Sequence, residues 1–191
     1  FHIECCFGGF GEPRAYWWRD YKNISGGAFF DWGAHFVDWV LQLMPHKIES
    51  VSGDFKKLKW HHISNEDYSS AYVRFEGGRS ASVEIGSINA IGKAKWRILG
   101  TSGGIERLHA EPDGKDVVRL VTVHDGQRIE SKVPFGKSDS EGFYRNVADH
   151  LLVGEPLLVT PESARKVIAV LDLAEQSSKQ GGVPVKLPFE Q

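Results

Sequence analysis

The chain has 191 residues, of which 41% are hydrophobic and 25% charged, and its formal net charge is −2. This length and composition are ordinary for one globular domain with a substantial core, so residues 1–191 are predicted to form a single domain. The charge balance gives no attraction to nucleic acid or to an anionic membrane. No apolar run is long enough to cross a membrane, and no signal peptide is visible.

The first predicted strand covers residues 1–7 and contains both cysteines of the chain, Cys5 and Cys6. Adjacent residues of a strand point to opposite faces, so a disulfide between these two would need a strained turn. Free thiols are typical of a reducing compartment, and a cytoplasmic location is expected. Because this strand begins without an initiator Met, we expect the chain to be a fragment of a longer protein.

The most informative segment runs from Gly26 to Pro45 and predicts a helix with almost no polar surface. Ser25 is its expected N-cap, and Pro45 is expected to end it. Four polar side chains fall on one narrow face at helical spacing: Asp31, His35, Asp38 and Gln42. Buried ionisable groups need partners or a chemical role, so this stripe indicates a cleft.

Asp31 and His35 are spaced as an acid–base pair would be on a helix. The carboxylate could hydrogen-bond one ring nitrogen and leave the other facing a substrate hydroxyl. The alternative is a buried polar pair that satisfies itself within the core. Asp38 could bind His35 from the other side or hold a loop. A metal shared by His and Asp lacks an identifiable third ligand, so no metal site is predicted.

The loop before this helix carries Trp18, Arg19 and Tyr21. Aromatic faces stack on the apolar faces of sugar-like ligands, and Arg donates several hydrogen bonds, so the three form a candidate substrate-binding group. Loop aromatics that cap the core are the alternative. Residues 8–11 do not complete a dinucleotide-binding G-x-G-x-x-G, because its sixth position is Arg14 and no helix follows at once.

The middle of the chain is rich in strands, and the end is helical. Strands are predicted over residues 47–58, 68–75, 79–88, 94–99, 105–109, 116–123 and 128–133. Tight turns are expected at Glu76-Gly77-Gly78 and at Asp125-Gly126. Helices are predicted over 140–153 and from the capping sequence Thr160-Pro161-Glu162 onward, with a last strand at 183–187. Strands that are not interleaved with helices indicate an α+β fold with a mostly antiparallel sheet.

Residues 25–38 read SGGAFFDWGAHFVD and resemble the Gly-Gly-Gly…Asp-x-Gly-x-His-x-x-Asp signature of the Gfo/Idh/MocA oxidoreductases. Other segments fit the C-terminal domain of that family: WRILGTSGGIE at 96–106, Gly154-Glu155-Pro156 before Thr160, and Ser177-Ser178 in the closing helix. The resemblance covers essentially the whole chain. It implies an open, mostly antiparallel sheet with helices on one face, and an N-terminal Rossmann domain that this chain lacks.

The resemblance also implies an activity, that of an NAD(P)-dependent dehydrogenase. Such an enzyme oxidises a secondary hydroxyl of a sugar, inositol or related polyol, or runs the reverse reduction. His35 would be the general base, and Asp31 would orient it or relay its proton. The substrate would bind to the other polar and aromatic candidates, Trp18, Arg19, Tyr21 and Asp38.

The cofactor, NAD or NADP, would be held mainly by the absent domain, and the sequence contains neither the family's Glu-Lys-Pro motif nor a dinucleotide fingerprint. The fragment alone is therefore expected to be inactive. A homo-dimer or tetramer through the open sheet face is expected from the resemblance. The alternative is a non-catalytic ligand-binding or oligomerisation domain with the same fold.

Overall fold

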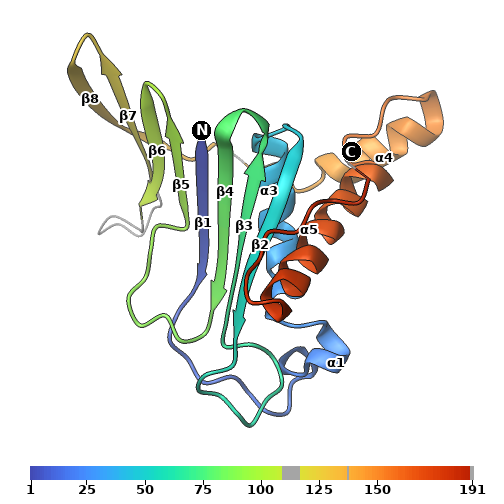
Figure 1. Cartoon of the computed structure of the whole chain (residues 1–191). Coiled ribbons are helices and arrows are strands. Elements are labelled where there is room, and N and C mark those ends of the chain that lie inside the picture. The colour runs from blue at the N-terminus through green and yellow to red at the C-terminus, as the bar shows by residue number, and fades with distance from the viewer. Residues whose placement is uncertain (109–116, 137, 190–191) are drawn as a thin grey trace.

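The computed structural model describes residues 1–108, 117–136 and 138–189. It contains an eight-stranded sheet with the order β2-β3-β4-β1-β5-β6-β7-β8 (Figure 1). The strands are β1 (His2–Gly8), β2 (Ile48–Lys56), β3 (Tyr68–Phe75), β4 (Arg79–Gly86), β5 (Trp96–Gly100), β6 (Gly103–Leu108), β7 (Val117–His124) and β8 (Gln127–Pro134). Only the β1–β4 pair is parallel, which confirms the predicted α+β class with a mostly antiparallel sheet.

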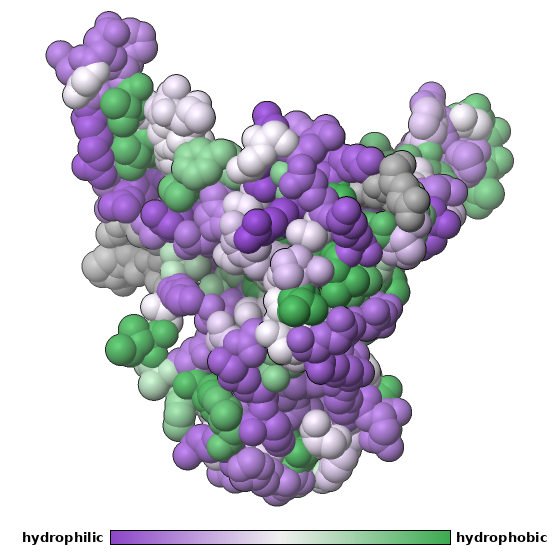
Figure 2. Space-filling model, in the orientation of Figure 1, coloured by the Kyte–Doolittle hydropathy of each residue, from purple (hydrophilic) through white to green (hydrophobic). Residues whose placement is uncertain are grey.

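The helices gather on one side of the sheet. They are α1 (Lys22–Ser25), α2 (Ala28–Asp31), α3 (Gly33–Leu43), α4 (Gly142–Val153) and α5 (Pro161–Lys179), with 3-10 turns η1 (Trp18–Asp20) and η2 (Glu76–Gly78). α3 and α5 pack on each other and on the half of the sheet formed by β2, β3 and β4. Helix α4 and the β7–β8 hairpin form two projections above this body (Figure 2).

The core lies between that half of the sheet and the two packed helices. Alternation along each strand sends one set of side chains inward, so Ile3 and Cys5 of β1 are buried while Glu4 and Cys6 are only half-buried. The largest fully buried side chains come from both layers: Phe29, Phe36, Phe75 and Leu171. Both thiols are free, and burial raises the pKa of Cys5 to about 12.

The edge strand β2 is closed by the C-terminal part of the chain. The backbone N–H groups of Gly53 and Phe55 donate to the hydroxyls of Ser177 and Ser178. The backbone of Val51 pairs with that of Val185, so the strand predicted over 183–187 is a single bridge. A protected edge prevents pairing with other chains, and β2 is therefore unavailable for it.

The predicted single helix over 26–45 is wrong in two respects. Gly26 and Gly27 have φ angles of +84° and +110°, so the chain ends α1 and starts again in α2. Ser25 is therefore the last residue of α1 and not an N-cap of the long helix. The helical segment is also not buried on all sides, because its outward face exposes Trp32, His35, Trp39, Gln42 and Leu43.

Most other predicted elements are confirmed within a few residues. The turn at Asp125-Gly126 has positive φ at both positions, as a two-residue hairpin requires. The predicted strand ends at His109 and Asp116 lie outside the described residues. In the described part of the chain, no helix has the length and hydropathy needed to span a bilayer.

Candidate active site

His35 lies on the outward face of α3 between two tryptophans. Its ring centroid is 6.3 Å from that of Trp32 and 6.3 Å from that of Trp39. Helical geometry brings these positions together, since residues three and four apart share a face. The imidazole is exposed, and each indole is 41% exposed. A titratable ring with apolar walls on both sides is therefore open to a ligand.

The indoles rest on aromatic side chains of the sheet. Trp32 packs on Phe7 of β1 at 4.5 Å between ring centroids, and Trp39 packs on Trp96 of β5 at 5.9 Å. We call these five side chains, Phe7, Trp32, His35, Trp39 and Trp96, the aromatic surface. The packing fixes both indoles, so a ligand would meet preorganised walls.

Lys95 adds a cation beside the aromatic surface. Its ammonium lies 5.4 Å from the ring centroid of Phe7 and 5.3 Å from that of Phe36. Such distances allow cation–π attraction. Sequence reasoning missed Lys95, Trp96 and Phe7, although each belongs to a predicted strand. Their approach to α3 depends on long-range pairing of β1 with β4 and β5, which residue spacing does not reveal.

Asp31 binds Arg19, not His35. The Arg19 Nη1 donates to both carboxylate oxygens, at 3.0 and 3.2 Å. Among the described residues, no hydrogen bond joins Asp31 to His35. The carboxylate of Asp31 turns toward the preceding loop, where the guanidinium of Arg19 binds both of its oxygens.

The predicted loop group is brought together only in part. The Arg19 guanidinium lies 5.3 Å from the ring centroid of Trp17 and 5.1 Å from that of Trp18. Both indoles are about half exposed. Tyr21 has a local contact instead, since its hydroxyl donates to the carbonyl of Ala15. The structure thus joins Trp18 and Arg19 to Asp31, while Tyr21 stabilises the loop.

The segment that contains Asn65 and Asp67 is hydrogen-bonded to this loop. The Asn65 side-chain amide donates to the carbonyl of Arg19, and the Asn65 backbone N–H donates to the carbonyl of Asp20. Asp67 anchors the same segment: it is fully buried and accepts from the backbone N–H groups of Leu58 and Lys59, each at 2.6 Å. Sequence spacing gave no signal for this role.

The charge of Asp67 is held in place by its donors. Burial alone would raise the pKa of this carboxyl. The backbone hydrogen bond from Lys59 and the ammonium of Lys57, 3.0 Å away, outweigh burial and hold the pKa below its ordinary value of 3.8. Asp67 is therefore a fixed anion that closes the 57–67 loop.

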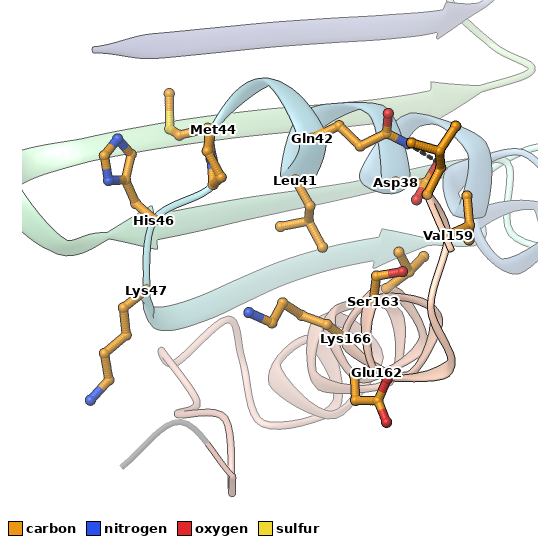
Figure 3. Close-up of a pocket in the computed structure, with 13 residues that line it drawn as sticks. Asp38, Leu41, Gln42, Met44, His46, Lys47, Val159, Glu162, Ser163 and Lys166 are labelled. Atoms are coloured by element: carbon orange, nitrogen blue, oxygen red, sulfur yellow. Dashed lines mark hydrogen bonds between the residues drawn. The ribbon is translucent and has the colours of Figure 1, made fainter. Parts of the chain in front are cut away.

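Asp38 lies in another pocket, away from His35. That pocket has a volume of about 640 Å³ and lies between α3 and α5 (Figure 3). Asp38 accepts a hydrogen bond of 2.7 Å from the side-chain amide of Gln42. Ser163 and Lys166 of α5 line the same space, whereas His35 does not. The predicted stripe therefore divides between two surfaces.

In the described part of the chain, no three His, Cys, Asp or Glu side chains gather closely enough to hold a metal ion.

The same fold occurs in larger proteins. It matches one half of larger proteins: a TM-score of 0.84 relates it to the yvaA oxidoreductase of Bacillus subtilis, at 18% identity over 97% of this chain and 57% of that one. An NAD-binding protein from Listeria innocua gives 0.77 at 23% identity, over 97% and 55%. These identities establish the fold alone.

The family follows from the sequence match. Residues 1–106, more than half of the chain, match the family described as the GFO/IDH/MocA C-terminal domain, and the chain belongs to it. The chain is also 25% identical over 180 residues to scyllo-inositol 2-dehydrogenase (NADP(+)) IolW of Bacillus subtilis. That match covers 85% of this chain and 50% of the dehydrogenase, so the chain spans about half the length of its curated relative.

Proposed function

We propose that this chain is the substrate-binding half of an NAD(P)-dependent dehydrogenase that oxidises a secondary hydroxyl of a sugar, inositol or related polyol, or reduces the matching ketone. The observation that supports this most is the exposed His35 held between Trp32 and Trp39. Membership of the GFO/IDH/MocA C-terminal domain family and the relation to an NADP-dependent inositol dehydrogenase support the same chemistry.

His35 is the proposed general base. Oxidation of an alcohol removes a proton from the hydroxyl oxygen and a hydride from the carbon that carries it. A ring nitrogen of His35 accepts the proton, for which an exposed imidazole between two indoles is suited. The nicotinamide cofactor, NAD or NADP, supplies the hydride acceptor when bound. In this proposal its main binding residues belong to an N-terminal half of the whole protein.

The aromatic surface is the proposed platform for the polyol ring. Cyclic polyols present apolar C–H faces, which pack on indoles while their hydroxyls remain free for hydrogen bonds. Trp32 and Trp39 provide such faces on either side of the proposed base. Lys95 provides a donor at the edge of this platform. Substrate orientation would thus be set by side chains that flank His35.

Arg19 and Asp31 are proposed to act together at the rim of the site. The Asp31 carboxylate fixes the guanidinium beside Trp18, where its remaining N–H groups can reach substrate hydroxyls. Orientation of His35 by Asp31 would require the carboxylate to exchange Arg19 for the imidazole. Substrate contacts of Tyr21 and Asp38 have less support, because the Tyr21 hydroxyl binds the carbonyl of Ala15 and the Asp38 carboxylate binds Gln42.

An activity assay distinguishes this proposal from the alternative, a non-catalytic binding or oligomerisation domain. The whole parent protein is incubated with NAD⁺ or NADP⁺ and a panel of polyols that includes scyllo-inositol, and nicotinamide absorbance is followed. We expect at least one polyol to reduce one of the two cofactors. Failure with every polyol, and with the matching ketones in reverse, would favour the non-catalytic alternative.

Two variants of α3 test the platform. Trp39→Ala should lower kcat/KM by roughly tenfold, because the ring loses one stacking wall. Leu43→Ala is the matched control: Leu43 is also exposed on α3, at 57%, but is not part of the aromatic surface. Equal effects of both substitutions would contradict the platform.

We further propose that the chain alone is inactive, that the protein is cytoplasmic, and that copies associate through the open face of the sheet. That face carries ion pairs between strands, among them Arg97–Glu4 and Arg119–Glu106. Interfaces with such charges are held by specific pairing more than by apolar burial.

A further inference from the structure

The outer strand β8 is an exposed edge. It is the last strand in the sheet order, and all eight of its residues are exposed. It pairs with β7 from Val117–Pro134 to His124–Gln127 without a bulge, and in Figure 1 it is the outermost labelled strand on that side. The other edge, β2, is closed by Ser177, Ser178 and Val185. Only β8 therefore presents a regular edge among the described strands.

The hairpin turn fixes which backbone groups of β8 point outward. A two-residue turn at Asp125-Gly126 closes on the pair His124–Gln127, which exchanges backbone hydrogen bonds. Hydrogen bonding alternates along the strand, so the backbones of Ile129, Ser131 and Val133 also bond to β7. The residues between them turn their backbone groups outward: Arg128, Glu130, Lys132 and Pro134. Pro134 offers a C=O but no N–H, so the other three are the residues that can both donate to and accept from another strand.

Two copies of β8 have complementary side chains when they pair in antiparallel direction about one position. In an antiparallel pair of two β8 strands centred on Ser131, Glu130 of each copy lies opposite Lys132 of the other. Ile129 lies opposite Val133 in the same arrangement, and Ser131 lies opposite its own symmetry mate. Both kinds of pair are favourable across strands, and opposite charges meet twice because of the two-fold axis.

Neighbouring registers lack this complementarity. Centring the pair on Glu130 places two glutamates opposite each other and sets Arg128 against Lys132, so every charged pair is repulsive. Centring it on Ile129 sets Glu130 against Arg128 but leaves Lys132 and Val133 opposite the hairpin turn. The register centred on Ser131 also makes Glu130–Lys132 the hydrogen-bonded pair, in agreement with the outward direction of their backbone groups.

We propose that β8 is a binding site for a second copy of this chain, which adds its own β8 in antiparallel register about a two-fold axis at Ser131. The two sheets then join into one continuous sheet. This site is separate from the aromatic surface, so its test does not depend on the proposed function.

Cross-linking at the axis tests the register. In it, Ser131 and its mate form a non-hydrogen-bonded pair with Cα atoms about 4.5 Å apart, within the range of a disulfide. Ser131→Cys should therefore give a covalent dimer under mild oxidation, seen as a doubled mass on a non-reducing gel. Ile129→Cys is the matched control, because it lies about 13 Å from its mate. The unaltered chain reports any cross-link through Cys5 or Cys6.

A cross-link at Ser131→Cys alone supports the proposal, and equal cross-linking of both variants, or of neither, overturns it. Charge exchange gives an independent measurement by sedimentation equilibrium. Lys132→Glu should weaken the association by roughly tenfold, since two carboxylates then meet twice. The double variant Glu130→Lys with Lys132→Glu should restore it. Its new carboxylate at position 132 lies opposite Arg119 and takes the place of the ion pair that Glu130 makes with Arg119. An association unchanged by Lys132→Glu, or not restored by the exchange, contradicts the register.

Discussion

Ser177 offers a sharp test of how α5 holds the sheet. Its hydroxyl accepts from the backbone N–H of Gly53 at 3.0 Å and donates to the carbonyl of Val183 at 2.6 Å. The side chain is fully buried, so water cannot replace it. Ser177→Ala leaves the buried N–H of Gly53 without its partner, at a cost of about 1–3 kcal/mol. It also removes the donor to the carbonyl of Val183, a residue that is 46% exposed, at a cost of about 1 kcal/mol. The expected loss in the free energy of unfolding is therefore about 2–4 kcal/mol.

Ser178→Ala is the matched control for that substitution. Ser178 accepts from the backbone N–H of Phe55 at 2.8 Å but is only half-buried, so water can take its place. Its expected cost is about 1 kcal/mol. Urea unfolding followed by circular dichroism measures both variants, and Tm should fall by roughly 5–15 °C for Ser177→Ala. Equal losses for the two variants, or a loss below about 0.5 kcal/mol for Ser177→Ala, would refute the reasoning.

Three other substitutions probe the support of the site. Asp67→Asn should cost roughly 3 kcal/mol at pH 7, because it strips the buried anion from Lys57. The depressed pKa of Asp67 means that the wild type loses stability as pH falls below about 4. Urea unfolding at pH 7 and at pH 3 should therefore show that the free energy of unfolding falls less between these two pH values in Asp67→Asn than in the wild type. Gly53→Ala should destabilise the protein by roughly 3 kcal/mol, since a Cβ would lie 1.9 Å from the Ala174 carbonyl oxygen. Gly9→Ala is the control: its Cβ meets no atom within 4 Å, so the free energy of unfolding should not change in the same assay. Arg19→Met should lower kcat/KM of the whole enzyme by roughly tenfold, and an unchanged value would remove Arg19 from the proposed site.

Strands and turns were predictable because their signals are local. Alternation and the Gly-containing turns placed β3, β4 and the β7–β8 hairpin close to their observed bounds. The capping sequence at Thr160 likewise placed the start of α5, where the hydroxyl accepts from the backbone N–H of Ser163. The sheet order was not predictable, since β1 lies between β4 and β5, strands that come much later in the chain.

Of the candidate site, the sequence predicted the local structure around one residue, His35. The motif around His35 placed it correctly on a helix, but helical spacing could not show that Asp31 binds Arg19 of the preceding loop. The apolar face that indicated burial is in part an exposed aromatic surface. Hydrophobicity alone does not distinguish a core contact from a ligand-binding wall, and the partners of Asp31 and Trp39 come from other elements.

The central claim is that His35 removes the substrate proton, and one rate comparison tests it most directly. His35→Ala is made in the whole parent protein, and the rate of cofactor reduction by the best polyol is compared with that of the wild type. Circular dichroism first shows that the variant is folded as the wild type is. We expect kcat to fall by about 10²–10⁴-fold, the usual contribution of a general base. A kcat within a few-fold of the wild type, in a folded variant, would contradict the claim.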